Sequence, residues 1–209
     1  MKQLDYLRNR NISNQSIEEF GFAYRDSKGN FYSYNLDFNL KQQAERLSFY
    51  SGQRFSNSFL YPVYDLYQDY IGFMCRNLDT EIKPKFDGSS FVKASHLYNL
   101  NKSYLYIIKH KFVVITEGVF DVVALWQAGY KNCVAVLGTA FTEEHGCLLS
   151  RFCNKAILSF DNDEAGKKCA KVTKDILVSL NFTVQELNLE KELDDELMAN
   201  SKLLDNYYI

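Results

Sequence analysis

The sequence has few residues of the kinds that interrupt or cross-link a chain. Only 2 of its 209 residues are proline and 10 are glycine, which excludes collagen-like and low-complexity architectures. The 5 cysteines are scattered and include no Cys-x-x-Cys pair. Because a zinc ribbon needs closely paired thiolates to complete a tetrahedral site, we expect no structural zinc in this chain.

Long apolar runs are also missing. An uncharged stretch such as 132–142 is far shorter than the roughly 20 residues that a membrane-spanning helix needs. The first residues show neither the apolar core nor the small-residue cleavage site of a signal peptide. We therefore expect a soluble, cytoplasmic protein with no membrane partner.

The sequence has no excess of positive charge. The 24 Lys and Arg residues face 26 Asp and Glu residues, a net charge of −2. This balance argues against a basic nucleic-acid coat protein but does not exclude an enzyme that acts on nucleic acid. Residues 1–100 carry 12 basic and 11 acidic residues and 20 of the 32 aromatic residues, whereas the remainder carries 12 basic and 15 acidic residues. We therefore expect two domains, 1–102 and 103–209.

The first domain combines helical and strand patterns. Ser13 offers an N-cap for its second helix, and a turn signal at 26–30 precedes alternating aromatic residues. We expect a smaller α+β domain with a mostly β centre. Its predicted helices are 4–12, 15–20 and 40–50, and its predicted strands are 31–38, 59–64 and 70–74.

The second domain alternates short apolar strands with helical segments. Alternation with short connections predicts an α/β fold, a parallel sheet flanked by helices. Thr142 can cap one of the helices, and Gly129 closes another. The predicted strands are 104–108 (short, or the first half of a bent strand), 112–116, 133–137, 156–160 and 182–187, and the predicted helices are 119–128, 143–152 and 164–180.

Acidic residues follow three of these strands. Glu117 comes after the strand 112–116, and Asp161 and Asp163 come after the strand 156–160. Further acids, Glu192, Asp194 and Asp195, follow the last strand. In an open parallel sheet the working site lies outside the carboxyl ends of the strands, so these side chains should gather at one edge.

Such a cluster of carboxylates predicts a bound divalent cation. Two anions about 4 Å apart repel by roughly 4 kcal/mol at an effective dielectric near 20, and Mg²⁺, which prefers oxygen ligands, removes that repulsion. The alternative is that Asp161 and Asp163 only cap the helix that begins at 164. The neighbouring Glu117 favours the metal site.

These residues resemble the motifs of a known family, the Toprim domains. Segment 114–125 (Val-Ile-Thr-Glu-Gly-Val-Phe-Asp-Val-Val-Ala-Leu) resembles the glutamate motif, and 137–140 (Leu-Gly-Thr-Ala) looks like the primase branch. Segment 159–166 (Ser-Phe-Asp-Asn-Asp-Glu-Ala-Gly) matches the Asp-x-Asp motif. Segment 191–195 (Lys-Glu-Leu-Asp-Asp) is similar to a looser third acidic motif, in which Glu192 replaces the usual Asp.

The resemblance implies roles for these acids. Asp161, Asp163 and Asp194 are the expected ligands of Mg²⁺ (or Mn²⁺), with Glu192 as a further ligand. Glu117 is either a metal ligand or the general acid/base. Asp121 either orients a metal-bound water or caps its helix.

The first domain resembles the opening of the RNA-polymerase core of bacterial DnaG-type primases. The similar blocks occur in family order, at 6–13, 20–24, 59–65, 71–76, 84–86 and 93–100. The resemblance implies that Arg76, Lys85 and Lys93 bind nucleotide or template, the alternative being ordinary solvated cations. The aromatic residues are either stacking platforms or sheet core, and the core is favoured. His145 is expected to pack or cap rather than to act in catalysis.

The resemblance implies a catalytic core that synthesises short RNA primers on single-stranded DNA from NTPs. In this interpretation 1–102 binds template and nucleotide, and 103–209 is the catalytic Toprim domain. The family's zinc-binding and helicase-binding domains have no counterpart here, so we expect a minimal core, encoded by a phage or plasmid, with a replicative helicase and a separate zinc-binding module as partners. The alternatives are a Toprim nuclease or nicking enzyme, and a non-catalytic replisome subunit that binds template or helicase.

Overall fold

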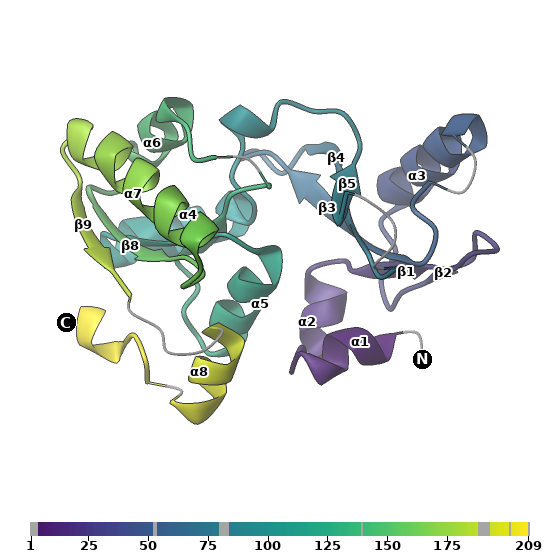
Figure 1. The fold of residues 1–209 in the computed structure, drawn as a ribbon, viewed down its shortest axis with the longest axis horizontal. Helices are drawn as coiled ribbons and strands as arrows, with labels where there is room; N and C mark the ends of the chain where they lie inside the picture. The colour runs from purple at the N-terminus through teal and green to yellow at the C-terminus, as the bar shows by residue number, and fades with distance from the viewer. Residues whose placement is uncertain are drawn as a thin grey trace. The chain divides into compact units, whose positions relative to one another are not determined.

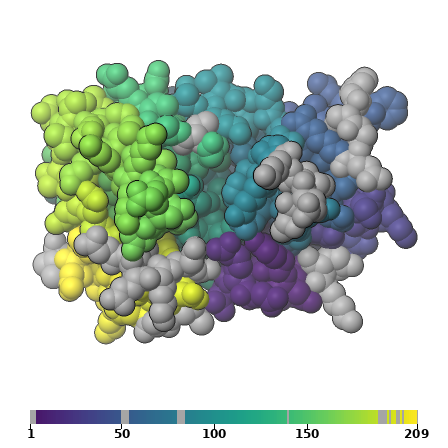
Figure 2. Space-filling model, viewed as in Figure 1, coloured from purple at the N-terminus to yellow at the C-terminus, as the bar shows by residue number. Residues whose placement is uncertain are grey.

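In the computed structural model the chain divides into two units, Met1–Phe91 and Val92–Ile209. The structure describes residues 4–51, 54–79, 84–138, 140–187, 193–200 and 202–208. Figure 1 shows the units as ribbons and Figure 2 shows one face in space-filling form. The domain boundary expected at 102/103 falls inside a helix of the second unit. None of the helices within the described residues is long and apolar enough to span a membrane.

An antiparallel sheet forms the first unit, with strand order β2-β1-β3-β4-β5. The central hairpin of β3 and β4 is the longest pairing, and Tyr61 lies opposite Met74 within it. The helices are α1 (Asp5–Asn9), α2 (Asn14–Glu19) and α3 (Phe38–Ser51), and the strands are β1 (Ala23–Arg25), β2 (Phe31–Tyr32), β3 (Ser58–Tyr64), β4 (Tyr70–Asn77) and β5 (Phe86–Gly88).

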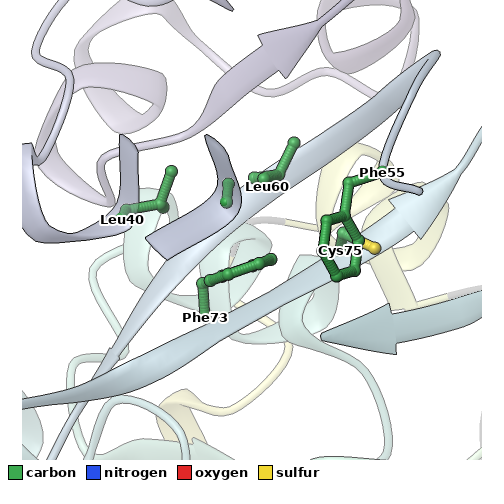
Figure 3. Close-up of a cluster of buried hydrophobic side chains, with 6 residues drawn as sticks. Leu40, Phe55, Leu60, Phe73 and Cys75 are labelled. Atoms are coloured by element: carbon green, nitrogen blue, oxygen red, sulfur yellow. The ribbon is translucent and has the colours of Figure 1, made fainter. Parts of the chain in front are cut away.

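The core of this unit lies between α3 and one face of the β3–β4 hairpin. Figure 3 shows the cluster, whose buried members are Leu40, Ala44, Phe55, Leu60, Phe73 and Cys75. Phe73 and Cys75 alternate with Met74 along β4, and Met74 is also buried. Because both faces of the hairpin are covered, β3 and β4 are apolar along most of their lengths, which made them recognisable in the sequence.

Local signals in the first unit have mixed outcomes. Ser13 caps α2 as predicted, because its hydroxyl accepts a hydrogen bond of 3.1 Å from the Ser16 amide. The strand predicted at 31–38 is wrong beyond Tyr32. Asp37 instead caps α3 by accepting from the Leu40 amide at 2.8 Å, so the chain leaves the sheet earlier.

The second unit contains a fully parallel sheet with strand order β7-β6-β8-β9. The helices α5 and α8 pack together, as do α6 and α7. The predicted fold class is therefore confirmed. The strands are β6 (Val113–Thr116), β7 (Cys133–Ala135), β8 (Lys155–Ser159) and β9 (Thr183–Glu186), and the helices are α4 (Leu100–His110), α5 (Val119–Gln127), α6 (Glu143–Leu149), α7 (Glu164–Ser179) and α8 (Leu193–Ala199).

The strand predicted at 104–108 is wrong, because this segment lies within α4. The buried positions Leu100, Ser103 and Ile107 follow helical spacing, while Leu105 and Ile108 remain 60% and 47% exposed. A short apolar run cannot be assigned to helix or strand by periodicity alone, and packing of one face against β7 decides for the helix.

The order of the strands creates a switch point between β6 and β8. From β6 the chain crosses to β7 on one side, whereas from β8 it crosses to β9 on the other side. Right-handed connections therefore place α5 and α7 on opposite faces of the sheet. In open α/β sheets the crevice beyond the carboxyl ends of two such strands is the usual location of a ligand site.

Candidate active site

Glu117 and Asp161 flank this switch point. Thr116, the last residue of β6, pairs in register with Ser159, the last residue of β8. Glu117 directly follows Thr116, and Asp161 is separated from Ser159 by Phe160 alone. The parallel register therefore brings the glutamate motif and the Asp-x-Asp motif to one edge of the sheet, as the sequence predicted.

The carboxyl of Glu117 is influenced by its burial and by two neighbouring aspartates. Glu117 is half-buried, and its burial raises the pKa of its carboxyl above the ordinary value, with the negative charges of Asp161 and Asp163 adding to the shift. The pKa of the Cys169 thiol, in α7, is also raised. Burial is the main cause, and the charges of Glu117 and Asp163 add to it. The edge is thus a region of negative potential that favours a cation or a proton.

Two of the acids also cap helices. Asp163 is the N-cap of α7, and its Oδ1 accepts a hydrogen bond of 2.7 Å from the Gly166 amide. Asp121 accepts a hydrogen bond of 3.1 Å from the Gly118 amide at the start of α5. The capping expected as an alternative is therefore present for both. The cap of α7 uses one of the two oxygens of Asp163, so capping does not preclude metal binding by this residue.

The third acidic motif is only partly described. Glu192 lies outside the described residues, and Asp194 belongs to α8 but its side chain is not described. The helix α8 packs against α5, the helix that follows Glu117, and its Leu193 and Leu197 are buried. The roles of Glu192 and Asp194 as ligands remain predictions.

The donor set at this edge fits a hard divalent cation. Within the described part of the chain, no three His, Cys, Asp or Glu side chains are grouped closely enough to form a complete metal cage. Mg²⁺ does not need such a cage, because it usually keeps several waters and is held by one or two carboxylates together with substrate phosphates. A cation at this edge would reduce the repulsion between the carboxylate of Glu117 and those of Asp161 and Asp163.

A pocket of about 220 Å³ opens beside Asp161, between the ends of β8 and β9 and the start of α7. Its polar lining includes Asn162, Lys167 and Glu186. The sequence motifs did not point to Lys167. The signal that could have found it is its position, directly after Gly166 in the first turn of the helix that the Asp-x-Asp motif begins.

Arg76 and Lys85 lie in the first unit, around an exposed aromatic ring. The Arg76 guanidinium lies 5.3 Å from the ring centroid of Phe86 and 5.6 Å from that of Tyr6. The Lys85 ammonium lies 5.9 Å from the same Phe86 ring, which is 39% exposed. The favoured assignment of the aromatic residues to the core holds for only a minority of those described in this unit, because most are partly buried or exposed. The Phe86 ring is open to solvent and lies close to two cations.

The edge strand that carries Phe86 is anchored by an ion pair. Arg54 donates from Nε and Nη2 to the two carboxylate oxygens of Asp87, each at 2.8 Å, and Nη2 also donates to the Gly88 carbonyl at 3.1 Å. Such a two-pronged pair fixes geometry as well as charge. Lys93 belongs to the second unit, on a one-turn 3₁₀ helix, Lys93–Ser95, that precedes α4.

The sequence matches two known families. Residues 1–104 match the family described as DNA primase catalytic core, N-terminal domain, and residues 114–197 match the family described as Toprim-like. The chain is similar to the DNA primase of Rickettsia prowazekii, with 34% identity over 202 residues that cover 91% of this chain and 33% of the relative. It is also similar to the DNA primase of Clostridium acetobutylicum, with 30% identity over 221 residues that cover 96% and 36%. The chain thus spans about a third of the length of these curated relatives.

Solved structures show the same fold. The zinc-binding and RNA polymerase domains of the Aquifex aeolicus primase superpose with a TM-score of 0.79 at 23% identity, covering 98% of this chain and 54% of that one. A DnaG primase catalytic domain bound to single-stranded DNA superposes with a TM-score of 0.74 at 24% identity, covering 97% and 69%.

Together the fold and the two family matches define a Toprim-like domain preceded by an N-terminal domain of the primase catalytic-core type. The chain belongs to the family of bacterial DnaG-type primases.

Proposed function

We propose that this chain is the catalytic core of a DNA primase, a nucleotidyltransferase that synthesises short RNA primers on a single-stranded DNA template. The observation that supports this most directly is the convergence of Glu117 with Asp161 at the switch point of the parallel sheet. The match of residues 1–104 to the primase N-terminal domain favours synthesis over the other reactions of Toprim proteins.

Asp161 and Asp163, with Asp194 and Glu192 from the third motif, are the residues that would hold the metal. Divalent-metal dependence is general for such cores, and we expect Mg²⁺ with Mn²⁺ as a substitute. A bound divalent cation would neutralise charge on the attacking 3′-hydroxyl and on the α-phosphate. Glu117, whose pKa is raised by burial and by its acidic neighbours, is suited either to complete the ligand set or to exchange a proton with the attacking hydroxyl.

The basic residues would bind the phosphates of the substrates. Arg76 and Lys85 flank the exposed ring of Phe86, and a single-stranded template offers phosphates for the cations and a base for the ring. Lys93, in the second unit, would bind a phosphate of the NTP or template. In this proposal residues 1–102 contribute template and nucleotide contacts and 103–209 the chemistry.

Incubation with single-stranded DNA, NTPs and Mg²⁺ or Mn²⁺ tests the function. We expect labelled short RNA products that disappear in Asp161→Ala. Strand cleavage without synthesis would contradict the proposal and would favour a Toprim nuclease or nicking enzyme. Absence of both activities, even with partners added, would leave a non-catalytic subunit that binds template or helicase.

We also propose the partners and the setting. A replicative helicase and a separate zinc-binding module would bring the core to its template. A phage or plasmid replisome in the bacterial cytoplasm is the setting that we expect. Stimulation of primer synthesis on addition of a helicase or a zinc-module protein is the corresponding measurement.

A further inference from the structure

The turn that carries Lys93 is fastened to the start of α6 by two side chains. The Thr142 hydroxyl donates a hydrogen bond of 2.7 Å to the carbonyl of Ala94. His145 Nε2 lies 3.0 Å from the carbonyl oxygen of Lys93 itself. Thr142 is also the N-cap of α6, accepting from the His145 amide at 3.2 Å. The cap of one helix therefore holds the turn Lys93–Ser95.

These contacts determine which nitrogen of His145 carries the proton. The Thr142 backbone N–H can only donate, and it lies 3.2 Å from His145 Nδ1, so Nδ1 must accept. The proton of the neutral ring is therefore on Nε2, where it is donated to the Lys93 carbonyl. His145 is completely buried, and burial lowers the pKa of its imidazole, opposed by hydrogen bonding to the backbone of Lys93 and His96. Both ring nitrogens are thus committed to the backbone.

The same turn lies at the edge of the sheet where the acids gather. Tyr98 forms an antiparallel bridge with Ala135, the last residue of β7. In an antiparallel pairing the residues before Tyr98 run beyond the carboxyl end of β7. The strand β7 neighbours β6, which leads into Glu117. Lys93 is therefore placed on the acidic edge, within its own unit.

We propose that His145 is a positioning residue for Lys93: its neutral Nε2–H tautomer holds the Lys93 carbonyl so that the ammonium faces a phosphate group at the acidic edge. The phosphate belongs to an NTP or to the template backbone. This inference rests on the proposed function, because it requires Lys93 to bind substrate. It assigns to His145 a role beyond packing and capping.

Two amide substitutions separate positioning from capping. In His145→Asn the side-chain oxygen takes the place of Nδ1, so the Thr142 N–H keeps its acceptor while the Lys93 carbonyl loses its donor. In His145→Gln the longer side chain can place an amide N–H where Nε2 was. We expect His145→Asn to raise the apparent Kd or KM for the phosphate ligand about tenfold, the scale of one hydrogen bond to a charged group, and His145→Gln to recover most of the loss.

The Lys93→Ala background tests whether the effect passes through Lys93. We expect His145→Asn to add almost nothing to the loss caused by Lys93→Ala, with thermal unfolding of each variant recorded in parallel. Titration of NTP and of single-stranded DNA in separate experiments identifies which phosphate is bound. An undiminished effect of His145→Asn in the Lys93→Ala background, or equal effects of the Asn and Gln variants, would overturn the proposal.

The failure of the proposed function gives a different result. If the unsubstituted chain makes no primers but its phosphate-ligand affinity still depends on His145 through Lys93, then primer synthesis fails and the positioning role stands. If primers are made and Lys93→Ala leaves both affinities unchanged, the positioning role fails alone. Nitrogen-15 NMR of the His145 ring must also show the neutral Nε2–H tautomer, and an Nδ1–H tautomer or an imidazolium would contradict the geometry.

Discussion

Gly166 lies directly against the backbone of Asp161, and a Cβ at position 166 would come within 2.1 Å of the Asp161 carbonyl oxygen. The same glycine donates its amide hydrogen to Asp163. The Asp-x-Asp motif and the glycine of the following helix therefore pack tightly together. The turn that carries both acids leaves no room for a side chain at position 166. This relationship explains why the motif extends to Gly166.

Gly166→Ala should distort that turn. Because the obstacle is backbone, it cannot move aside as the end of a flexible side chain could, and we expect unfolding free energy to fall by about 1–3 kcal/mol, as for other overpacked sites. Primer synthesis should fall with it. Denaturant unfolding followed by circular dichroism, and synthesis at fixed protein concentration, measure the two effects.

Gly129→Ala is the matched control. Gly129 has a positive φ of 96° but no atom within 4 Å of the added Cβ, so the change strains the backbone at the end of α5 without touching the acids. Synthesis per folded molecule should be unaffected there. Equal losses of synthesis in the two variants would argue against a specific role of the Asp161–Gly166 contact.

Asp163→Asn and Asp163→Ala separate capping from metal binding. Asn caps helices about as well as Asp, whereas Ala loses the cap and costs about 1 kcal/mol. We expect Asp163→Asn to keep most of the unfolding free energy and to lose the Mg²⁺-dependent activity, and Asp163→Ala to lose both. Full activity in Asp163→Asn would show that this acid serves only as the cap.

Glu117→Gln should stabilise the metal-free protein at neutral pH. Because the pKa of Glu117 is raised above its ordinary value of 4.5, the folded state binds the proton more tightly than the unfolded chain does. The resulting stabilisation is fully present below that ordinary value and is lost as pH rises through the raised pKa. In EDTA, the variant should therefore unfold at a higher temperature than the wild-type protein at pH 7, with the difference vanishing in acid.

The same substitution should reduce activity. Loss of a ligand or of a general acid/base typically lowers rates by about 10²–10⁴-fold. Added Mg²⁺ should raise the unfolding temperature of the wild-type protein more than that of Glu117→Gln, because the cation relieves repulsion that the variant no longer has. An identical response to Mg²⁺ in both proteins would place the cation away from Glu117.

Lys85→Ala should weaken binding of single-stranded DNA and reduce its salt dependence. Each phosphate contact to a single strand contributes about 0.7 to the slope of log K against log salt concentration, so we expect the slope to fall by about that amount. Lys28→Ala is the control, since Lys28 lies in the exposed turn between β1 and β2 of the same unit. Unchanged slopes in both variants would exclude Lys85 from the template path.

Local sequence signals predicted much of the structure. Ser13, Thr142 and Asp163 each cap the helix that follows them, because an N-cap depends on residues only a few positions apart. The parallel sheet followed from the alternation of strands and helices, and the meeting of Glu117 with Asp161 followed from the parallel register. The segment 104–108 was assigned wrongly because its apolar run suits either structure, and its packing partner lies elsewhere in the chain.

Other features depended on contacts between distant residues. Lys93 and His145 are 52 positions apart, and neither segment contains a pattern that predicts the hydrogen bond between the His145 ring and the Lys93 carbonyl. The exposure of Phe86 between Arg76 and Lys85 likewise depends on how β4 and β5 pair. By itself the sequence determined the helix caps, the parallel class of the sheet and the position of the acids at the strand ends. Short-range hydrogen bonds and hydrophobic periodicity depend only on residues close together in the sequence. Only the tertiary structure decided that residues 104–108 form part of a helix, that Lys93 belongs to the second unit, and which groups His145 contacts. Those outcomes depend on burial against residues far along the chain.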